Sequence, residues 1–182
     1  LTEGLRVGCR VGGSDLSEKA VRDTISNIDW LMRSGLYQIE EGKPDRFFGY
    51  KHVALKADEI AVRASEVAHV QKIVTSGSIQ VIVTEPYLGP VFNEDPTPGK
   101  LERIIKGLEK MYIGGLSSMR EILVPGGVIV FAEPIFFMPN KSYKVGIIDN
   151  PDRFGYTLES KIVEYKRDKA FVGRRIGVLV KK

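Results

Sequence analysis

Four consecutive residues, Thr84, Glu85, Pro86 and Tyr87, follow an apolar run at positions 79–83 and suit the recognition of an amino group. Proline has no backbone N–H and turns the preceding carbonyls away from a helix, and the side-chain oxygens of Thr84 and Glu85 add acceptors. Such acceptors orient the lone pair of an exocyclic amine toward an electrophile, while Tyr87 can stack on the base that carries the amine. The alternative is a turn that ends a strand, with Tyr87 covering the sheet edge.

A second polar group follows two earlier strand candidates. Asp15 stands after a glycine-dotted strand and before a helix, where an acid can accept hydrogen bonds from both hydroxyls of a ribose. The alternative for Asp15 is a turn with a helix-capping acid. Glu66, next to Ser65, can accept a hydrogen bond from an adenine amino group. The alternative for Glu66 is a solvated residue in the first turn of a helix.

The elements of the first third must position Asp15, Ser65 and Glu66. Residues 7–13 are a strand candidate, and Ser17 is a candidate N-cap for a helix that Gly35 ends. Residues 36–58 keep no single period and are expected to be a connection. Residues 59–64 predict a strand, and residues 65–74 predict a short helix or turn.

The remaining elements must position residues 84–87. The unbroken apolar run at 79–83 predicts a central parallel strand buried on both faces. A long helix is expected from Lys100 until Pro125, followed by a strand at 128–137. Glu133 and Pro134 are expected at the carboxyl end of that fourth strand.

Strands that alternate with helices imply right-handed crossovers and a mostly parallel sheet, with ligands at the carboxyl ends of the strands. Residues 159–167 and 174–182 are expected to pair as an antiparallel hairpin at a sheet edge. The predicted fold is therefore α/β and Rossmann-like, with helices on both faces and a C-terminal antiparallel hairpin.

Composition sets broad limits on function. The chain has 182 residues, of which 43% are hydrophobic and 27% charged, as expected for one globular domain. The net charge of +4 is compatible with a polyanionic partner but is not specific. Cys9, His52 and His69 are too few for a disulfide framework or a Cys/His zinc site, and they favour a reducing compartment.

Targeting signals are not evident in the sequence. No apolar run approaches the ~20 residues that cross a bilayer, and the first residues do not resemble a signal peptide. The expected location is the cytoplasm, with no membrane partner. The chain begins with Leu1 in place of methionine, which suggests a fragment.

Four segments together resemble the Rossmann-like S-adenosylmethionine-dependent methyltransferases. The resemblance is to the RNA methylase family that includes the tRNA guanosine-10 methyltransferases. The segments follow the family's order and cover most of the chain; they are VGGSDLSEKAVRDTISNIDWL, QVIVTEPYLG, LVPGGVIVFAEP and VGRRIGVLVKK. The first two segments are the more specific. They resemble the family's ribose-binding acid with its following helix, and its Asp/Asn-Pro-Pro-aromatic motif.

The resemblance implies roles for particular residues. Asp15 and Leu16 would bind the cofactor, with Asp15 on its ribose, and Ser65 or Glu66 would lie beside the adenine. Residues 84–87 would form the substrate-amine site, and Thr84 would also meet the cofactor. No metal is expected.

Two departures from the family pattern matter. If Tyr87 matches the aromatic residue of the motif, Thr84 and Glu85 stand where Asp or Asn and the first proline are usual. If Glu85 instead matches the acid, one proline is missing, so the side chain that accepts the amine hydrogen stays open. The family's glycine-rich cofactor loop should precede Leu1, and the chain starts where that loop would end.

The expected function is methyl transfer from S-adenosylmethionine to an exocyclic amine of a base in RNA, with guanine in tRNA as the first choice. An adenine or cytosine amine in DNA is an alternative target. A different alternative is a non-catalytic fragment that binds nucleic acid through the basic segment 165–175. The oligomeric state is not predicted.

Overall fold

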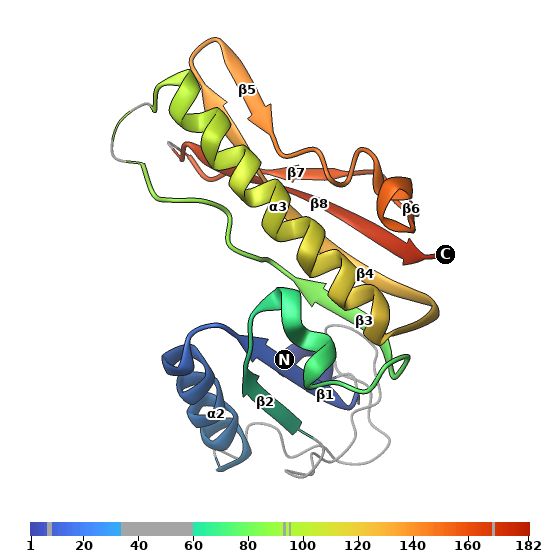
Figure 1. Cartoon of the computed structure of the whole chain (residues 1–182). Helices are drawn as coiled ribbons and strands as arrows, with labels where there is room; N and C mark the ends of the chain where they lie inside the picture. The colour runs from blue at the N-terminus through green and yellow to red at the C-terminus, as the bar shows by residue number, and fades with distance from the viewer. Residues whose placement is uncertain (7–8, 34–59, 93, 95, 169) are drawn as a thin grey trace. The chain divides into compact units, whose positions relative to one another are not determined.

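The computed structural model describes residues 1–6, 9–33, 60–92, 94, 96–168 and 170–182 (Figure 1). The described residues form two compact units, Leu1–Glu66 and Val67–Lys182. The predicted connection at residues 36–58 lies outside the described part of the chain.

The first unit contains a parallel pair of strands and two helices. Its elements are α1 (Thr2–Arg6), β1 (Val11–Asp15), α2 (Glu18–Arg33) and β2 (Ile60–Ala64). The helix predicted after Ser17 is confirmed, and the Ala20 N–H donates to the Ser17 hydroxyl at 3.2 Å, as an N-cap requires. The strand predicted at 7–13 instead spans Val11–Asp15, so Asp15 is its last residue. Helix α1, which buries Leu5, is not among the predicted elements.

The second unit is a six-stranded sheet with one long helix and two short ones (Figure 1). Its elements are η2 (Val67–Lys72), β3 (Ile79–Thr84), α3 (Pro98–Ile122), β4 (Leu123–Met138), β5 (Lys141–Lys144), η3 (Pro151–Phe154), β6 (Tyr156–Leu158), β7 (Val163–Tyr165) and β8 (Val172–Lys181).

Pairing in this sheet is parallel at one edge and antiparallel beyond it. The main strand order is β3-β4-β8-β6, with β3 and β4 parallel and joined by helix α3. Strand β8 runs antiparallel to β4, and β7 pairs with β8 as the predicted C-terminal hairpin. The α/β class, with parallel strands joined by helices and a C-terminal antiparallel hairpin, is therefore confirmed.

Helix α3 provides a large share of the core of this unit. Thr97 caps its first turn by accepting a hydrogen bond from the Lys100 N–H at 3.4 Å, and Pro98 occupies the first turn, where a missing N–H is harmless. The helix continues through Gly107, Gly114 and Gly115 and ends at Ile122. The residues that it buries against the sheet include Leu101, Leu108, Tyr112, Leu116, Met119 and Ile122. The Tyr112 ring meets the Phe131 ring edge-on, with 5.3 Å between centroids.

The two faces of the sheet differ in burial. Ile82, Ile129 and Leu179 are in register across β3, β4 and β8, and they belong to the core that α3 covers. The alternate positions form two rows on the other face, which is called the valine face below. These rows are Val81–Val128–Val180 and Val83–Val130–Val178.

Burial of the 79–83 strand on both faces is a wrong prediction. On the valine face, Val81 is 57% exposed and Val83 is 76% exposed. The reason is that the described helix that packs on these strands, α3, lies on the opposite face. An apolar run indicates a strand, but it does not state how many of its faces are covered.

Candidate active site

The 84–87 segment begins at the carboxyl end of β3. Thr84 is the last residue of this strand and lies opposite Phe131 of β4. Glu85, Pro86 and Tyr87 then leave the sheet without entering a helix. Tyr87 is 60% exposed, so its ring is accessible for stacking. The proline therefore stands where the strand ends, as the sequence predicts.

Helix α3 holds the backbone of this segment through Tyr112. The Tyr112 hydroxyl donates to the main-chain carbonyl of Tyr87 at 2.8 Å, and the Tyr112 side chain is fully buried. Burial raises the pKa of Tyr112 well above its ordinary value, and the nearby carboxylates of Glu133 and Glu85 raise this pKa further. Tyr112 therefore remains a neutral donor at physiological pH.

The Glu85 carboxylate forms an ion pair with Arg174 of β8. The Arg174 Nε donates to one Glu85 carboxylate oxygen at 2.5 Å and its terminal nitrogen donates to the other at 3.0 Å, which is a two-point ion pair. The hydrogen bond with Glu85 raises the pKa of Arg174. The Glu85 side chain is 48% exposed and the Arg174 side chain is 24% exposed, so the ion pair is in contact with water at the rim of the sheet.

Thr84 contrasts with Glu85. Its side chain is half-buried, and its hydroxyl makes no hydrogen bond with the described residues. Of the two acceptors that the sequence leaves open, the Thr84 hydroxyl is thus without a partner in the described part of the chain, whereas each Glu85 oxygen accepts a hydrogen bond from Arg174.

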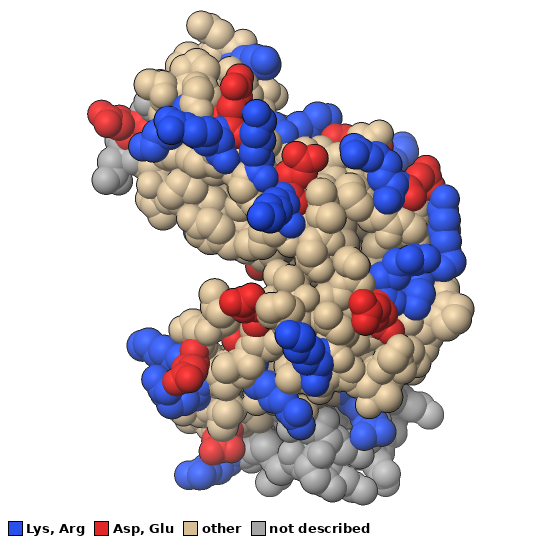
Figure 2. All heavy atoms as spheres, in the orientation of Figure 1, with Lys and Arg blue, Asp and Glu red and all other residues tan. Residues whose placement is uncertain are grey.

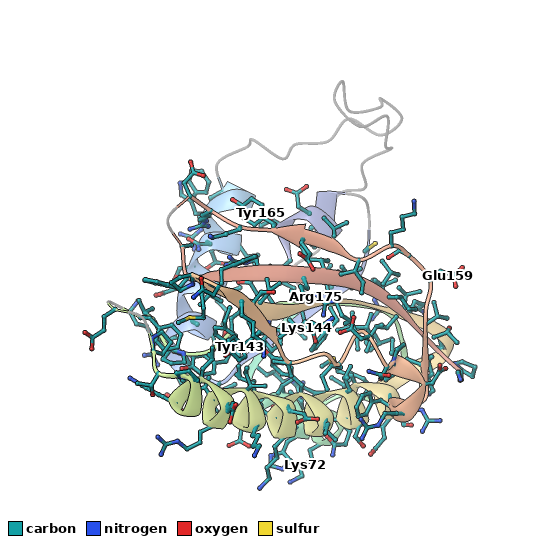
Figure 3. All side chains as sticks on the ribbon, turned by 90° about the horizontal axis from the view of Figure 1, so that it is seen from above. Lys72, Tyr143, Lys144, Glu159, Tyr165 and Arg175 are labelled. Carbon is teal, nitrogen blue, oxygen red and sulfur yellow. The ribbon has the colours of Figure 1, made fainter. Side chains whose placement is uncertain are left out.

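A cluster of ion pairs surrounds Arg175, which follows Arg174 in β8, and within it the side chains of Arg175 and Glu133 are buried. The Arg175 guanidinium pairs with Glu133 of β4, with Asp149 at 2.7 Å and with Glu164 of β7 at 3.2 Å. Lys144 of β5 also meets Asp149, at 2.9 Å. Figure 3 shows Lys144 and Arg175 converging on this region from different strands.

Glu133 does not end its strand, which corrects the sequence prediction. Strand β4 continues to Met138, so Glu133 stands in mid-strand and is completely buried. Burial raises its pKa, while the charge of Arg175 and hydrogen bonds from the Ile147 and Ile148 N–H groups act in the opposite direction. Asp149 differs, because its hydrogen bond with Arg175 lowers its pKa.

The predicted cofactor residues are brought together at the carboxyl edge of β1 and β2. The Ser65 N–H donates to the Asp15 carbonyl at 2.9 Å, because β1 and β2 are paired up to Asp15 and Ala64. The Asp15 Oδ1 accepts a hydrogen bond from the Ser17 N–H at 2.7 Å, and Oδ2 has no partner among the described residues. Leu16 is exposed.

Ser65 and Glu66 follow directly. The Ser65 hydroxyl donates to the Glu66 carbonyl at 3.1 Å, and Glu66 is an exposed residue that just precedes η2. Asp15, Leu16, Ser65 and Glu66 all belong to the first unit, whereas the 84–87 segment belongs to the second.

Three contributors to the site were not predicted from the sequence. The helical pattern from Lys100 contains Tyr112 but gives no sign of its role, although a buried tyrosine hydroxyl needs a hydrogen-bond partner. Arg174 and Arg175 were assigned only to a basic hairpin. Arg174 is 89 residues from its partner Glu85 in the sequence, and Arg175 is 42 residues from its partner Glu133. Local spacing therefore gives no signal of either pairing.

Metal and membrane features were searched over the described residues. There, no group of three or more His, Cys, Asp or Glu side chains is arranged to hold a metal ion. No helix in the described ranges is long and apolar enough to cross a membrane. Figure 2 shows Lys and Arg side chains interspersed with Asp and Glu side chains around α3, so charge alone does not define a partner.

Comparison with known proteins gives matches at the level of structure. No protein-family model matches the chain, and no curated protein matches it significantly. An S-adenosylmethionine-dependent methyltransferase from Methanosarcina mazei superposes with a TM-score of 0.55 at 10% identity, over 94% of this chain and 81% of that one. This chain has the fold of the S-adenosylmethionine-dependent methyltransferases.

Two further structures support the same fold. TrmN from Thermus thermophilus matches with a TM-score of 0.51 and 18% identity over 94% of this chain. The 1,6-didemethyltoxoflavin-N1-methyltransferase of Burkholderia thailandensis, solved with S-adenosylhomocysteine, matches with a TM-score of 0.53 and 13% identity over 96% of this chain and 62% of that one. The present methyltransferase-like chain spans 36% of the length of TrmN.

Proposed function

We propose that this chain is part of an S-adenosylmethionine-dependent methyltransferase that acts on an exocyclic amine of a base in RNA, with guanine in tRNA as the first choice. The observation that carries the proposal is the 84–87 segment, which places acceptors and an exposed tyrosine at the carboxyl end of a parallel strand. The methyltransferase fold supports the proposal.

The cofactor is proposed to bind at the edge of β1 and β2. The uncommitted oxygen of Asp15 fits a ribose hydroxyl, and Leu16, Ser65 and Glu66 follow at the same edge. Both described units then belong to a single catalytic domain that residues 1–182 cover in part.

The proposed mechanism requires positioning rather than a metal. S-Adenosylmethionine supplies an electrophilic methyl group on a sulfonium. Held by Asp15, Leu16, Ser65 and Glu66, it would supply this methyl group to the amine nitrogen, with S-adenosylhomocysteine as the leaving group and the amine proton passing to water. Tyr87 stacks on the base, while the Thr84 hydroxyl and the carbonyls around Pro86 accept the amine hydrogens.

Glu85 receives a different role from Thr84 in this proposal. Arg174 donates to both Glu85 oxygens and thereby fixes the direction in which this carboxylate points, whereas the Thr84 hydroxyl has no partner among the described residues. Thr84 is therefore proposed as the side chain that accepts the amine hydrogen, and Glu85 as part of the segment's support.

Methyl incorporation from labelled cofactor tests the function. The full-length protein is incubated with tRNA, and duplex DNA is the parallel acceptor; incorporation into tRNA is expected. Thr84→Val and Tyr87→Ala should each lower the rate by about 10-fold or more. Incorporation into DNA alone would replace the RNA target. Failure of the full-length protein to bind S-adenosylmethionine in calorimetry would favour a non-catalytic nucleic-acid-binding protein.

The proposed setting is the cytoplasm, where an RNA substrate of this kind is accessible. Fractionation of cells that express the full-length protein with a C-terminal tag checks this location. Recovery of the protein with a membrane fraction would contradict it.

A further inference from the structure

The 84–87 segment is held by two side chains that are remote from it in sequence. Tyr112 of α3 binds the main-chain carbonyl of Tyr87, and Arg174 of β8 binds the side chain of Glu85. Neither contact belongs to the regular pairing of β3 with β4. The conformation of the segment is therefore determined by tertiary contacts as well as by Pro86.

The two contacts reach the segment from opposite faces of the sheet. Tyr112 comes from α3, which covers the core face, and its ring packs edge-on against Phe131. Arg174 lies opposite Pro134 and alternates with the buried Arg175, so it projects on the valine face. Because β4 lies between β3 and β8, the Arg174 side chain crosses β4 to reach Glu85.

We propose that Arg174 and Tyr112 are positioning residues for the amine site, which fix Glu85 and the Tyr87 carbonyl so that Thr84 and the Tyr87 ring face the base. This inference rests on the proposed function for its chemical meaning. Its structural content is that the segment loses order when either contact is removed.

The chemistry of the two contacts supports this role. A two-point contact between guanidinium and carboxylate fixes direction as well as distance, which a lysine ammonium does not reproduce. A buried tyrosine hydroxyl on a main-chain carbonyl fixes the backbone itself and leaves the Tyr87 ring accessible. Together the contacts define both the backbone and one side chain of a segment that has no regular secondary structure.

The chain contains a matched control for Tyr112. Tyr156 is also fully buried, and its hydroxyl donates to a main-chain carbonyl, that of Leu116, at the same 2.8 Å. Tyr112→Phe and Tyr156→Phe therefore delete the same kind of hydrogen bond, but only the first touches the 84–87 segment. Arg22→Lys, in a surface pair with Glu18 on α2, is the corresponding control for Arg174→Lys.

Backbone order parameters from nitrogen-15 relaxation of the full chain, measured at Glu85, Tyr87, Leu88 and Gly89, test the positioning role. Tyr112→Phe and Arg174→Lys should each lower these order parameters from about 0.85 toward about 0.6, while the control variants leave them unchanged. Unchanged order parameters in both test variants, or an equal drop in Tyr156→Phe, would overturn the inference.

Kinetics of the full-length protein then connect positioning to the reaction. Both test variants should lower kcat for methyl transfer to tRNA and leave the Kd for S-adenosylmethionine within about twofold, because they touch the acceptor side of the site. Normal kcat in variants with lowered order parameters would contradict a role in catalysis. If the wild-type protein transfers no methyl group, the proposed function fails, and the relaxation experiment still decides the positioning of the segment.

Discussion

Arg175 and Arg174 are consecutive residues with different energetic roles. Arg175 is buried among three carboxylates, of which Glu133 is completely buried, whereas Arg174 meets Glu85 at the rim. A charge left unpaired in the interior is costly, whereas an ion pair in contact with water contributes little. The same residue type should therefore respond very differently to substitution at these two positions.

Arg175→Met is expected to lower the free energy of unfolding by about 3–5 kcal/mol, because it leaves Glu133 and Asp149 without their shared partner. Arg174→Met should cost about 1 kcal/mol or less. Urea denaturation followed by circular dichroism measures both. The double variant Arg175→Met/Glu133→Gln should recover part of the loss, and equal losses in the two single arginine variants would contradict the assignment.

Asp149 gives the ion cluster a dependence on pH. Its hydrogen bond with Arg175 lowers its pKa below the ordinary value of 3.8, so its stabilising contribution is present above that pH and is lost as the pH falls through the folded-state pKa. The stability difference between wild type and Asp149→Asn should therefore shrink as the pH decreases below 3.8. Denaturation at a series of acidic pH values checks this, and a constant difference would be inconsistent with it.

At the scale of elements, the glycines of α3 have unequal roles. Gly107 is exposed, and a Cβ added there would meet no atom within 4 Å. A Cβ at Gly115 would lie 3.1 Å from a Val67 methyl carbon of η2. Gly107 therefore only weakens the helix, whereas Gly115 allows η2 to approach it closely.

Gly107→Ala is expected to raise the free energy of unfolding by up to about 1 kcal/mol, because alanine restricts the unfolded chain and favours helix. Gly115→Ala should give no such gain, since its new methyl group presses on Val67. Thermal or urea unfolding of the two variants provides the comparison. A larger increase in the free energy of unfolding for Gly115→Ala than for Gly107→Ala would contradict this, because it would show that the contact with Val67 does not oppose a side chain at position 115.

The periodicity of the sequence predicts strand β3 and helix α3 better than it predicts which other elements pack against them. Strand β3 and helix α3 were predicted from an apolar run and a helical repeat, because both signals are local. The exposed Val81 and Val83 were not predicted, since coverage of a face depends on distant elements. The site shows the same limit: the sequence predicted where Glu85 stands but not that Arg174 occupies it.

At the scale of the whole molecule, the described residues fall into two units, and the second has a large apolar core. The large core cluster, which includes Leu116, Phe131 and Tyr156, lies entirely within Val67–Lys182. Within the described part of the first unit, Leu5 and Ile28 are the buried apolar side chains. The second unit therefore contains enough buried apolar surface to be the main source of cooperativity.

A fragment of residues 67–182 is expected to unfold in one cooperative transition, because its core comes from that unit alone. Far-ultraviolet circular dichroism during heating measures the transition. Leu116→Ala in this fragment should lower the free energy of unfolding by about 2–5 kcal/mol, since the side chain is completely buried. A broad, non-cooperative melt would show that the unit needs residues outside this range.

The alternation of Arg174 and Arg175 also fixes the alignment of β8 on β4. Residues 178–180 are apolar on both faces, so hydrophobicity there would tolerate a shift of one position. Such a shift would turn Arg174 inward and send Arg175 to the outside, away from Glu133, which the native pairing places directly opposite it. The two adjacent arginines therefore favour a single register of β8 on β4. The ion cluster around Arg175 stabilises the native register of the C-terminal hairpin over a shifted one.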